Sequence, residues 1–88
     1  MRKRELTIVN RLGLHARAAA RLVQTANRFR CDVTVAKDGE EVNAKSIMGI
    51  LMLAAPKGSA VVLTADGEDE TEALEALGQL INDGFGED

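Results

Sequence analysis

The sequence contains few of the residues on which many binding and catalytic sites depend. Its 88 residues include one cysteine, one histidine, two phenylalanines and no tryptophan or tyrosine. So few aromatic residues provide no platform for stacking nucleotide bases, which argues against single-stranded nucleic-acid binding. The lone Cys31 excludes an internal disulfide and is expected to be a small buried residue in a reducing compartment. One cysteine and one histidine form no recognisable zinc-ligand set, so we expect no metal site.

The chain also lacks an excess of positive charge and a long apolar segment. Its net charge is −3 at pH 7, which argues against a broad surface for DNA or RNA phosphates. The basic start, Met1–Arg4, is not followed by an apolar stretch, so it does not resemble a signal peptide. No apolar run is long enough to cross a membrane. We therefore expect a cytoplasmic protein that binds neither nucleic acid nor membranes.

The length and composition indicate one small globular domain. Apolar residues make up 45% of the chain and charged residues 28%, which are ordinary proportions for a globular protein. A chain this short can bury a single core. We see no repeat or linker, so the predicted domain spans residues 1–88.

Local patterns predict alternating strands and helices in the order β-α-β-β-α-β-α. Four segments rich in β-branched residues are predicted strands: residues 3–9, 32–36, 41–44 and 59–65. Three segments with apolar residues at helical spacing are predicted helices: residues 16–28, 47–53 and 71–83. This order favours a two-layer α+β fold, an open-faced sandwich with a four-stranded, mainly antiparallel sheet and three helices on one face. The tail, residues 84–88, is expected to be frayed, with Phe85 as its one candidate for a contact.

Several polar residues predict where turns and helices begin. Asp38 and Gly39 have the sequence of a tight hairpin turn. Ser46 is a good N-cap residue for the short second helix. Asp69 and Glu72 have the spacing of a capping box at the start of the third helix.

The only histidine lies where a turn leads into the first predicted helix. Gly13 allows the backbone to turn tightly, and His15 falls at the N-cap position or one residue before it. A helix N-terminus offers free N–H groups and a positive partial charge, and Arg17 adds a planar cation suited to phosphate. A neutral imidazole can act as a nucleophile, and the helix end would hold the resulting phosphoryl group. His15 and Arg17 therefore form a candidate phosphoryl-accepting site.

The same two residues have simpler interpretations. His15 can be an exposed loop residue and Arg17 a solvated helix residue, in which case the chain is an interaction module without chemistry. A small hydrolase that uses His15 as an acid or base is a further alternative. It would need a second catalytic group or a metal, and none adjoins His15 in the sequence. Spacing alone leaves these alternatives open.

Three segments together resemble a known family. Gly13–Arg17 (GLHAR) is similar to the active-site signature of HPr, the histidine-containing phosphocarrier of the bacterial phosphoenolpyruvate-dependent phosphotransferase system. Ala44–Met48 (AKSIM) resembles that family's second signature, around a regulatory serine, and lies at the matching distance. Gly67–Glu70, before the last helix, also fits the family. The resemblance covers essentially the whole chain, and the predicted order of strands and helices is the HPr order.

The resemblance implies a role for each residue of the first signature. His15 would take a phosphoryl group on Nδ1 from phosphorylated enzyme I and pass it to an enzyme IIA domain. Arg17 would neutralise the phosphate, and the backbone N–H groups of Ala16 and Arg17 would hold its oxygens. The protein would be a stoichiometric carrier and not an enzyme, without a cofactor, and we expect a monomer. Many family members have proline where Ala18 stands, but alanine forms helices well, so we expect the helix start to survive.

The resemblance also implies regulation and docking. An HPr kinase/phosphorylase could phosphorylate Ser46, beside the face that binds the partners. The implied docking residues for enzyme I and enzyme IIA lie on the first two helices: Ala20, Arg21, Gln24, Ile47, Met48, Gly49 and Leu51. A nitrogen-related, regulatory branch of the same system is the main alternative, because residues 83–88 and 51–53 are similar to that branch.

Overall fold

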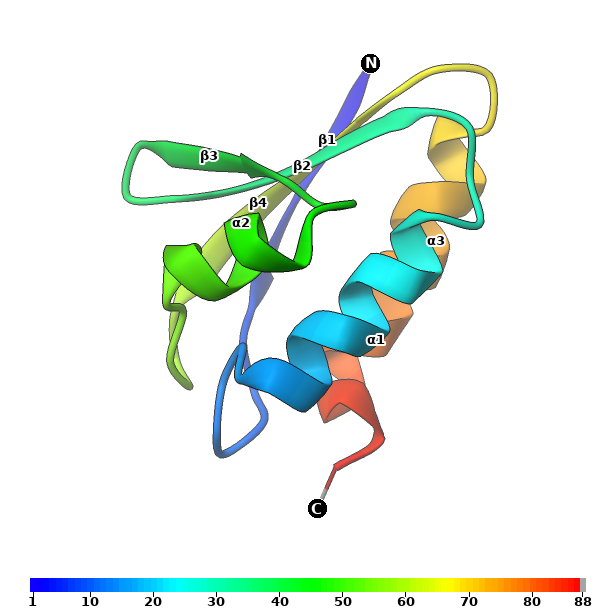
Figure 1. Cartoon of the computed structure of the whole chain (residues 1–88). Helices are drawn as coiled ribbons and strands as arrows, with labels where there is room; N and C mark the ends of the chain where they lie inside the picture. Colours follow the sequence, from blue (N-terminus) through cyan, green and yellow to red (C-terminus); the bar gives the residue numbers. More distant parts are fainter. Residues whose placement is uncertain (88) are drawn as a thin grey trace.

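The computed structural model describes residues 1–87 and contains the predicted succession of strands and helices (Figure 1). The strands are β1 (Arg2–Thr7), β2 (Asp32–Lys37), β3 (Glu40–Asn43) and β4 (Ala60–Asp66). The helices are α1 (Ala16–Ala26), α2 (Ile47–Leu53) and α3 (Glu70–Asn82), followed by a short 3-10 turn, η1 (Gly84–Gly86). These bounds lie close to those expected from the residue pattern.

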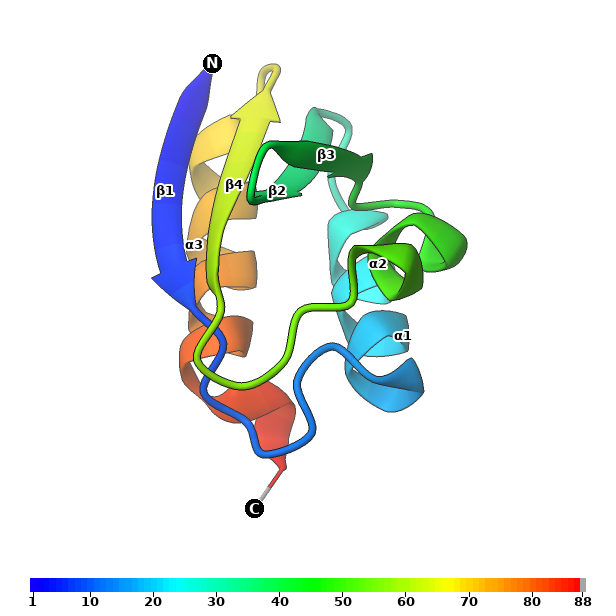
Figure 2. The same cartoon turned by 90° about the vertical axis from the view of Figure 1, so that its left-hand side faces the viewer.

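The four strands form one antiparallel sheet in the order β1-β4-β2-β3. The helices cover one face of this sheet, which confirms the predicted two-layer α+β architecture (Figure 2). The turn between β2 and β3 is also as predicted. Lys37 pairs with Glu40, and Asp38 and Gly39 between them have φ values of 52° and 84°. Two positive φ angles are characteristic of the type I′ turn that matches the twist of a hairpin.

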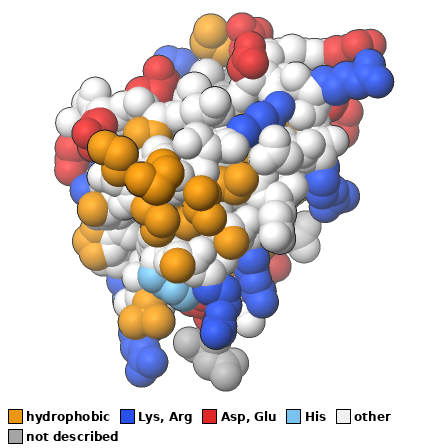
Figure 3. All heavy atoms as spheres, in the orientation of Figure 1, with side chains coloured by type: hydrophobic (Ala, Val, Ile, Leu, Met, Phe, Trp, Pro, Cys, Tyr) orange, Lys and Arg blue, Asp and Glu red, His pale blue; other side chains and the backbone are white. Residues whose placement is uncertain are grey.

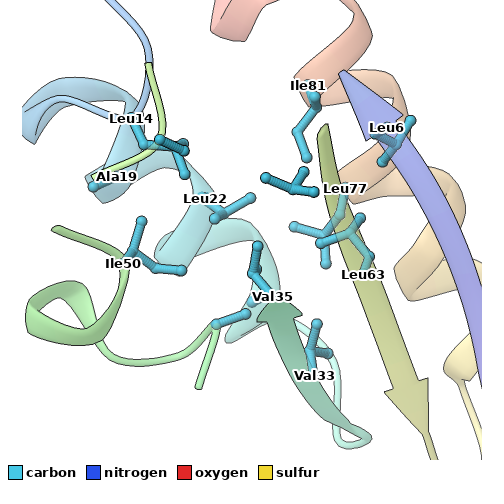
Figure 4. Close-up of a cluster of buried hydrophobic side chains, with 14 of the residues drawn as sticks. Leu6, Leu14, Ala19, Leu22, Val33, Val35, Ile50, Leu63, Leu77 and Ile81 are labelled. Carbon is cyan, nitrogen blue, oxygen red and sulfur yellow. The ribbon is translucent and has the colours of Figure 1, made fainter. Parts of the chain in front are cut away.

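Alternate residues of the central strands form the floor of the core. Val33 and Val35 in β2 are buried, whereas Thr34 between them is only half-buried. These side chains face apolar residues of the helices, including Leu22 and Leu77 (Figure 4). Apolar residues at helical spacing in α1 and α3 are buried: Ala19, Leu22, Ala26, Leu74, Leu77 and Ile81. Two others, Val23 and Leu80, are partly buried against the same cluster.

The loop between α1 and β2 contains the single cysteine. Cys31 is buried, as predicted, with 2% of its surface exposed. Burial raises the pKa of its thiol to about 11. Its backbone N–H donates to a carboxylate oxygen of Asp69 at 2.9 Å, and that of Arg30 donates to the other oxygen at the same distance.

The predicted capping box at α3 is therefore wrong. Asp69 occupies the N-cap position of α3, but its side chain makes no capping hydrogen bond. Two backbone N–H groups from the loop between α1 and β2, those of Arg30 and Cys31, already donate to both of its oxygens. Glu70 takes a related role, because its Oε1 accepts from the Gly67 N–H at 3.1 Å. The N-cap role of Ser46 is confirmed, since its Oγ accepts from the Gly49 N–H at 3.2 Å.

The expectation of a frayed tail is wrong for residues 84–87. Gly84, Phe85 and Gly86 form a left-handed turn with φ values of 64°, 59° and 72°. Such a conformation is unfavourable for phenylalanine, yet the Phe85 side chain is fully buried, and that burial offsets the backbone cost. The guanidinium of Arg21 in α1 donates to the carbonyl oxygen of Phe85. The tail is therefore fixed against α1, and Glu87, which follows this turn, lies near the start of that helix.

Candidate functional site

A tight turn directs the chain into α1. Gly13 has a φ of +66°, and a Cβ atom there would lie 2.4 Å from the carbonyl oxygen of Ala55 and 2.8 Å from Cα of Pro56. Glycine is thus required for both its conformation and its lack of a side chain. The Gly13 N–H donates to the Asn10 carbonyl at 3.1 Å, and the Leu14 N–H donates to the Ala55 carbonyl at 2.9 Å. The first bond closes the turn, and the second ties the entry of α1 to the loop that precedes β4.

His15 is the N-cap residue of α1, as the sequence predicts. Its backbone is extended, with φ −76° and ψ −179°, and its side chain makes no capping hydrogen bond. Its carbonyl accepts the Ala19 N–H at 2.8 Å. The N–H groups of Ala16 and Arg17 come too early in the helix to have an intrahelical acceptor, so they are available to an anion. The helix begins at Ala16 with Ala18 fully buried, which confirms that alanine preserves this helix start.

The surface around His15 is a hollow with a positive charge balance. It is lined by Arg11, Leu12, His15, Ala16, Arg17, Arg21, Gly86 and Glu87, so three guanidinium groups face one carboxylate. The His15 side chain is 27% exposed, and Figure 3 shows it at the surface beside blue Lys or Arg side chains. A concave site with this balance favours an anionic group such as phosphate. The structure thus brings the predicted pair, His15 and Arg17, to one hollow.

Glu87 lies in this hollow and was missed by the sequence analysis, as was Arg11. Its Oε2 lies 2.6 Å from Nε2 of His15, and its Oε1 accepts from Nδ2 of Asn10 at 3.0 Å. The hydrogen bond from Asn10 is the main cause that lowers the pKa of Glu87, and His15 and Arg17 lower it further. The only hint in the sequence was Phe85, an apolar residue between two glycines that could anchor the tail.

Asn10 belongs to the same arrangement. It is buried, with 4% of its surface exposed. Its Nδ2 donates to the Gly13 carbonyl at 2.7 Å as well as to Glu87. One amide group therefore connects the turn before His15 to Glu87, which contacts His15.

The predicted docking residues lie on α1 and α2, and several of them are exposed. Four apolar side chains of α2 project into solvent, here called the apolar patch: Ile47, Met48, Leu51 and Met52. Figure 3 shows hydrophobic side chains gathered next to the histidine. Met52, which is 72% exposed, was not among the predicted docking residues. A concentration of exposed apolar side chains is typical of a protein-binding surface.

The other predicted docking residues differ in their surroundings. Arg21 and Gln24 are exposed, whereas Ala20 and Gly49 are half-buried. Arg21 is held by the carbonyl of Phe85, so it is fixed beside the hollow.

Within residues 1–87, no helix is long and apolar enough to cross a membrane. The same residues contain no group of three or more His, Cys, Asp and Glu side chains arranged to hold a metal ion.

Comparison with known proteins identifies the family. Residues 2–83 match the family profile described as "PTS HPr component phosphorylation site". The phosphocarrier protein HPr of Xylella fastidiosa strain Temecula1 is 51% identical over 88 residues, covering 100% of this chain and 99% of that protein. Relatives from other bacteria carry the same name, so the nitrogen-related alternative is not favoured.

Solved structures agree with this assignment. An HPr structure from Thermoanaerobacter tengcongensis has a TM-score of 0.97 and 50% identity, covering 100% of this chain and 99% of that one. The HPr dimer from the same organism matches with a TM-score of 0.80 and 50% identity, covering 99% of this chain and 100% of that one. The expected monomer is therefore not confirmed. With the fold, the sequence match and the solved relatives in agreement, the chain belongs to the HPr family of phosphocarrier proteins of the phosphotransferase system.

Proposed function

We propose that His15 accepts a phosphoryl group on Nδ1 from phosphorylated enzyme I and passes it to an enzyme IIA domain. The observation that carries the proposal is the position of His15 as the N-cap of α1, in a hollow that it shares with Arg17. In the transfer, the lone pair of Nδ1 forms a bond to phosphorus while the bond from phosphorus to the donor nitrogen breaks. Because both bonds join phosphorus to nitrogen, the step is close to reversible, which suits a carrier.

The residues around His15 have distinct roles in this proposal. The backbone N–H groups of Ala16 and Arg17, which lack intrahelical acceptors, bind the phosphoryl oxygens. The Arg17 guanidinium offsets the charge of the phosphoryl group during transfer. The chain requires no cofactor, and it acts as a stoichiometric carrier in the cytoplasm and not as an enzyme.

In this proposal, the partners dock on the surface formed by α1 and α2. Arg21 lines the hollow from α1, and Gln24 is exposed one turn farther along the same helix. The apolar patch is exposed on α2, and hydrophobic side chains lie next to the histidine in Figure 3. A partner seated there would cover His15 and exclude water from the transferring group. Enzyme I and enzyme IIA would use this surface in turn, since each must approach the same imidazole.

Ser46 is a candidate regulatory site on that surface. It immediately precedes Ile47 and Met48, which are exposed members of the apolar patch. Its phosphorylation by an HPr kinase/phosphorylase would place negative charge at the edge of an apolar contact. Such a charge opposes docking through desolvation and repulsion.

The test is direct phosphorylation. The chain is mixed with phosphoenolpyruvate, magnesium and enzyme I, and intact mass spectrometry detects an acid-labile phosphoryl adduct. We expect the wild type to gain one adduct and His15→Ala to gain none, with circular dichroism showing that the variant is folded. Full labelling of His15→Ala would contradict the assignment. No adduct on the wild type, with either the sugar or the nitrogen form of enzyme I, would favour an interaction module.

A further inference from the structure

The contact between Glu87 and His15 has no role in the proposed function as stated so far. We infer that Glu87, held by Asn10, is a positioning residue that fixes the His15 imidazole with Nδ1 free for phosphoryl transfer. The inference rests on the proposed function, because it concerns how the same imidazole is prepared for its reaction.

The first step is the hydrogen-bond chemistry of the pair. An ionised carboxylate can only accept hydrogen bonds, so Nε2 must carry the proton in the 2.6 Å contact with Oε2 of Glu87. A neutral imidazole carries a single N–H. Nδ1 is then the nitrogen with the free lone pair, and a lone pair is what the attack on phosphorus requires.

The second step is that Glu87 is itself held in place. Its other oxygen, Oε1, accepts from the buried Asn10 side chain at 3.0 Å. The same Asn10 nitrogen donates to the Gly13 carbonyl at 2.7 Å, so the carboxylate is tied to the turn that leads into His15. On the tail side, burial of Phe85 and its carbonyl contact with Arg21 fix the residues before Glu87. The imidazole is therefore oriented by a group that is anchored at both ends.

The third step is the charge that develops during transfer. When Nδ1 forms its bond to phosphorus, the ring retains its proton on Nε2 and gains positive character. The Glu87 carboxylate stabilises that charge through the existing hydrogen bond. Repulsion between this carboxylate and the incoming phosphoryl group is opposed by Arg11, Arg17 and Arg21, which line the same hollow. The arrangement of carboxylate, imidazole and cations thus favours the transfer.

The experiment compares three variants with the wild type. Glu87→Ala removes both hydrogen bonds. Glu87→Gln keeps the size, but an NH2 group replaces one of the two carboxylate oxygens, so only one of the two contacts keeps its acceptor. Asp83→Ala is the matched control, because it removes an exposed carboxylate from the same end of the chain without touching His15.

Steady-state phosphorylation by enzyme I gives the first readout. We expect Glu87→Ala to lower about tenfold the kcat of enzyme I with this chain as its substrate. This corresponds to about 1.4 kcal/mol in the activation free energy. KM should stay within about twofold, because Glu87 contacts the reacting ring and lies outside the apolar patch that we assign to docking. Glu87→Gln should fall between Glu87→Ala and the wild type, and Asp83→Ala should match the wild type.

Nuclear magnetic resonance of the ¹⁵N-labelled imidazole gives a second readout that a purely structural role would not change. The Nε2 proton, protected by the carboxylate, should give a resolved downfield signal in the wild type and in Asp83→Ala. Glu87→Ala should lose this signal through fast exchange with water.

The outcomes separate the inference from the proposed function. If the wild type and Glu87→Ala accept the phosphoryl group with equal kcat, the inference is overturned while the carrier function stands. Persistence of the Nε2 signal in Glu87→Ala would overturn it equally. A raised KM with unchanged kcat would indicate that Glu87 contributes to docking, and would also refute the positioning role. If the wild type accepts no phosphoryl group, the carrier function fails and the inference fails with it.

Discussion

Replacement of Phe85 by alanine tests how firmly the C-terminal turn is part of the fold. The Phe85 ring is fully buried, although it belongs to the last few residues of the chain. Removing a buried phenylalanine side chain costs about 3–5 kcal/mol, from lost apolar burial and from the cavity that remains. The alanine does not recover backbone strain, since it meets the same penalty at a φ of 59°. The predicted loss is a large fraction of the roughly 5–15 kcal/mol that stabilises a typical domain.

Urea denaturation followed by circular dichroism measures this loss. With an m-value of about 1.5 kcal/mol/M, the unfolding midpoint should fall by roughly 2–3 M. Met52→Ala is the control, because it truncates a side chain that is 72% exposed, and its free energy of unfolding should change by less than about 0.5 kcal/mol. A change below about 1 kcal/mol in Phe85→Ala would refute the reasoning, since it would show that the ring contributes little to the core.

Two further predictions concern charge. The pKa of Asp69 lies below its usual value, mainly because the backbone N–H of Arg30 donates to it and to a lesser extent because that of Cys31 does. The ionised carboxyl therefore stabilises the fold above a pH of about 3.9, and this stabilisation is lost as the pH falls through the folded pKa. Asp69→Ala should lower the unfolding midpoint at pH 7, and the difference in midpoint from the wild type should narrow progressively as the pH falls below about 4. An equal difference at pH 2.5 would contradict this cause. Ser46→Asp should raise the KM of enzyme I for this chain at low salt. Ser46→Ala should lose about 1 kcal/mol of stability with its N-cap and leave that KM unchanged. An unchanged KM in Ser46→Asp would exclude the apolar patch as the docking surface.

Much of the fold could be predicted because its signals are local. The Asp38-Gly39 turn, the Ser46 cap and the apolar spacing within α1 each depend on residues a few positions apart. Such patterns determine elements and their inward faces before any long-range contact is known. The start of α1 directly after His15 was predictable for the same reason, since Gly13 and the helix start are close together in the sequence.

The features that were missed depend on residues far apart in the sequence. Asp69 was expected to cap its own helix, but two N–H groups nearly forty positions earlier donate to its oxygens instead. Glu87 contacts a histidine 72 positions away. The tail of glycines and charges has no periodicity, so its packing depends on a single aromatic ring that finds space in the core. No local pattern contains that information.

Because Cys31 is buried, the reactivity of its thiol reports how often the fold opens. The thiolate is the form of cysteine that attacks thiol reagents. A pKa of about 11 together with 2% exposure therefore leaves this thiol almost unreactive while the fold is closed. Any slow labelling at neutral pH must therefore pass through an opening that exposes Cys31, either of the loop between α1 and β2 or of the whole fold. The labelling rate gives the frequency of that event without a dye or an added probe. A cysteine introduced at an exposed position would likewise be the one readily modified thiol, which permits attachment of a single label.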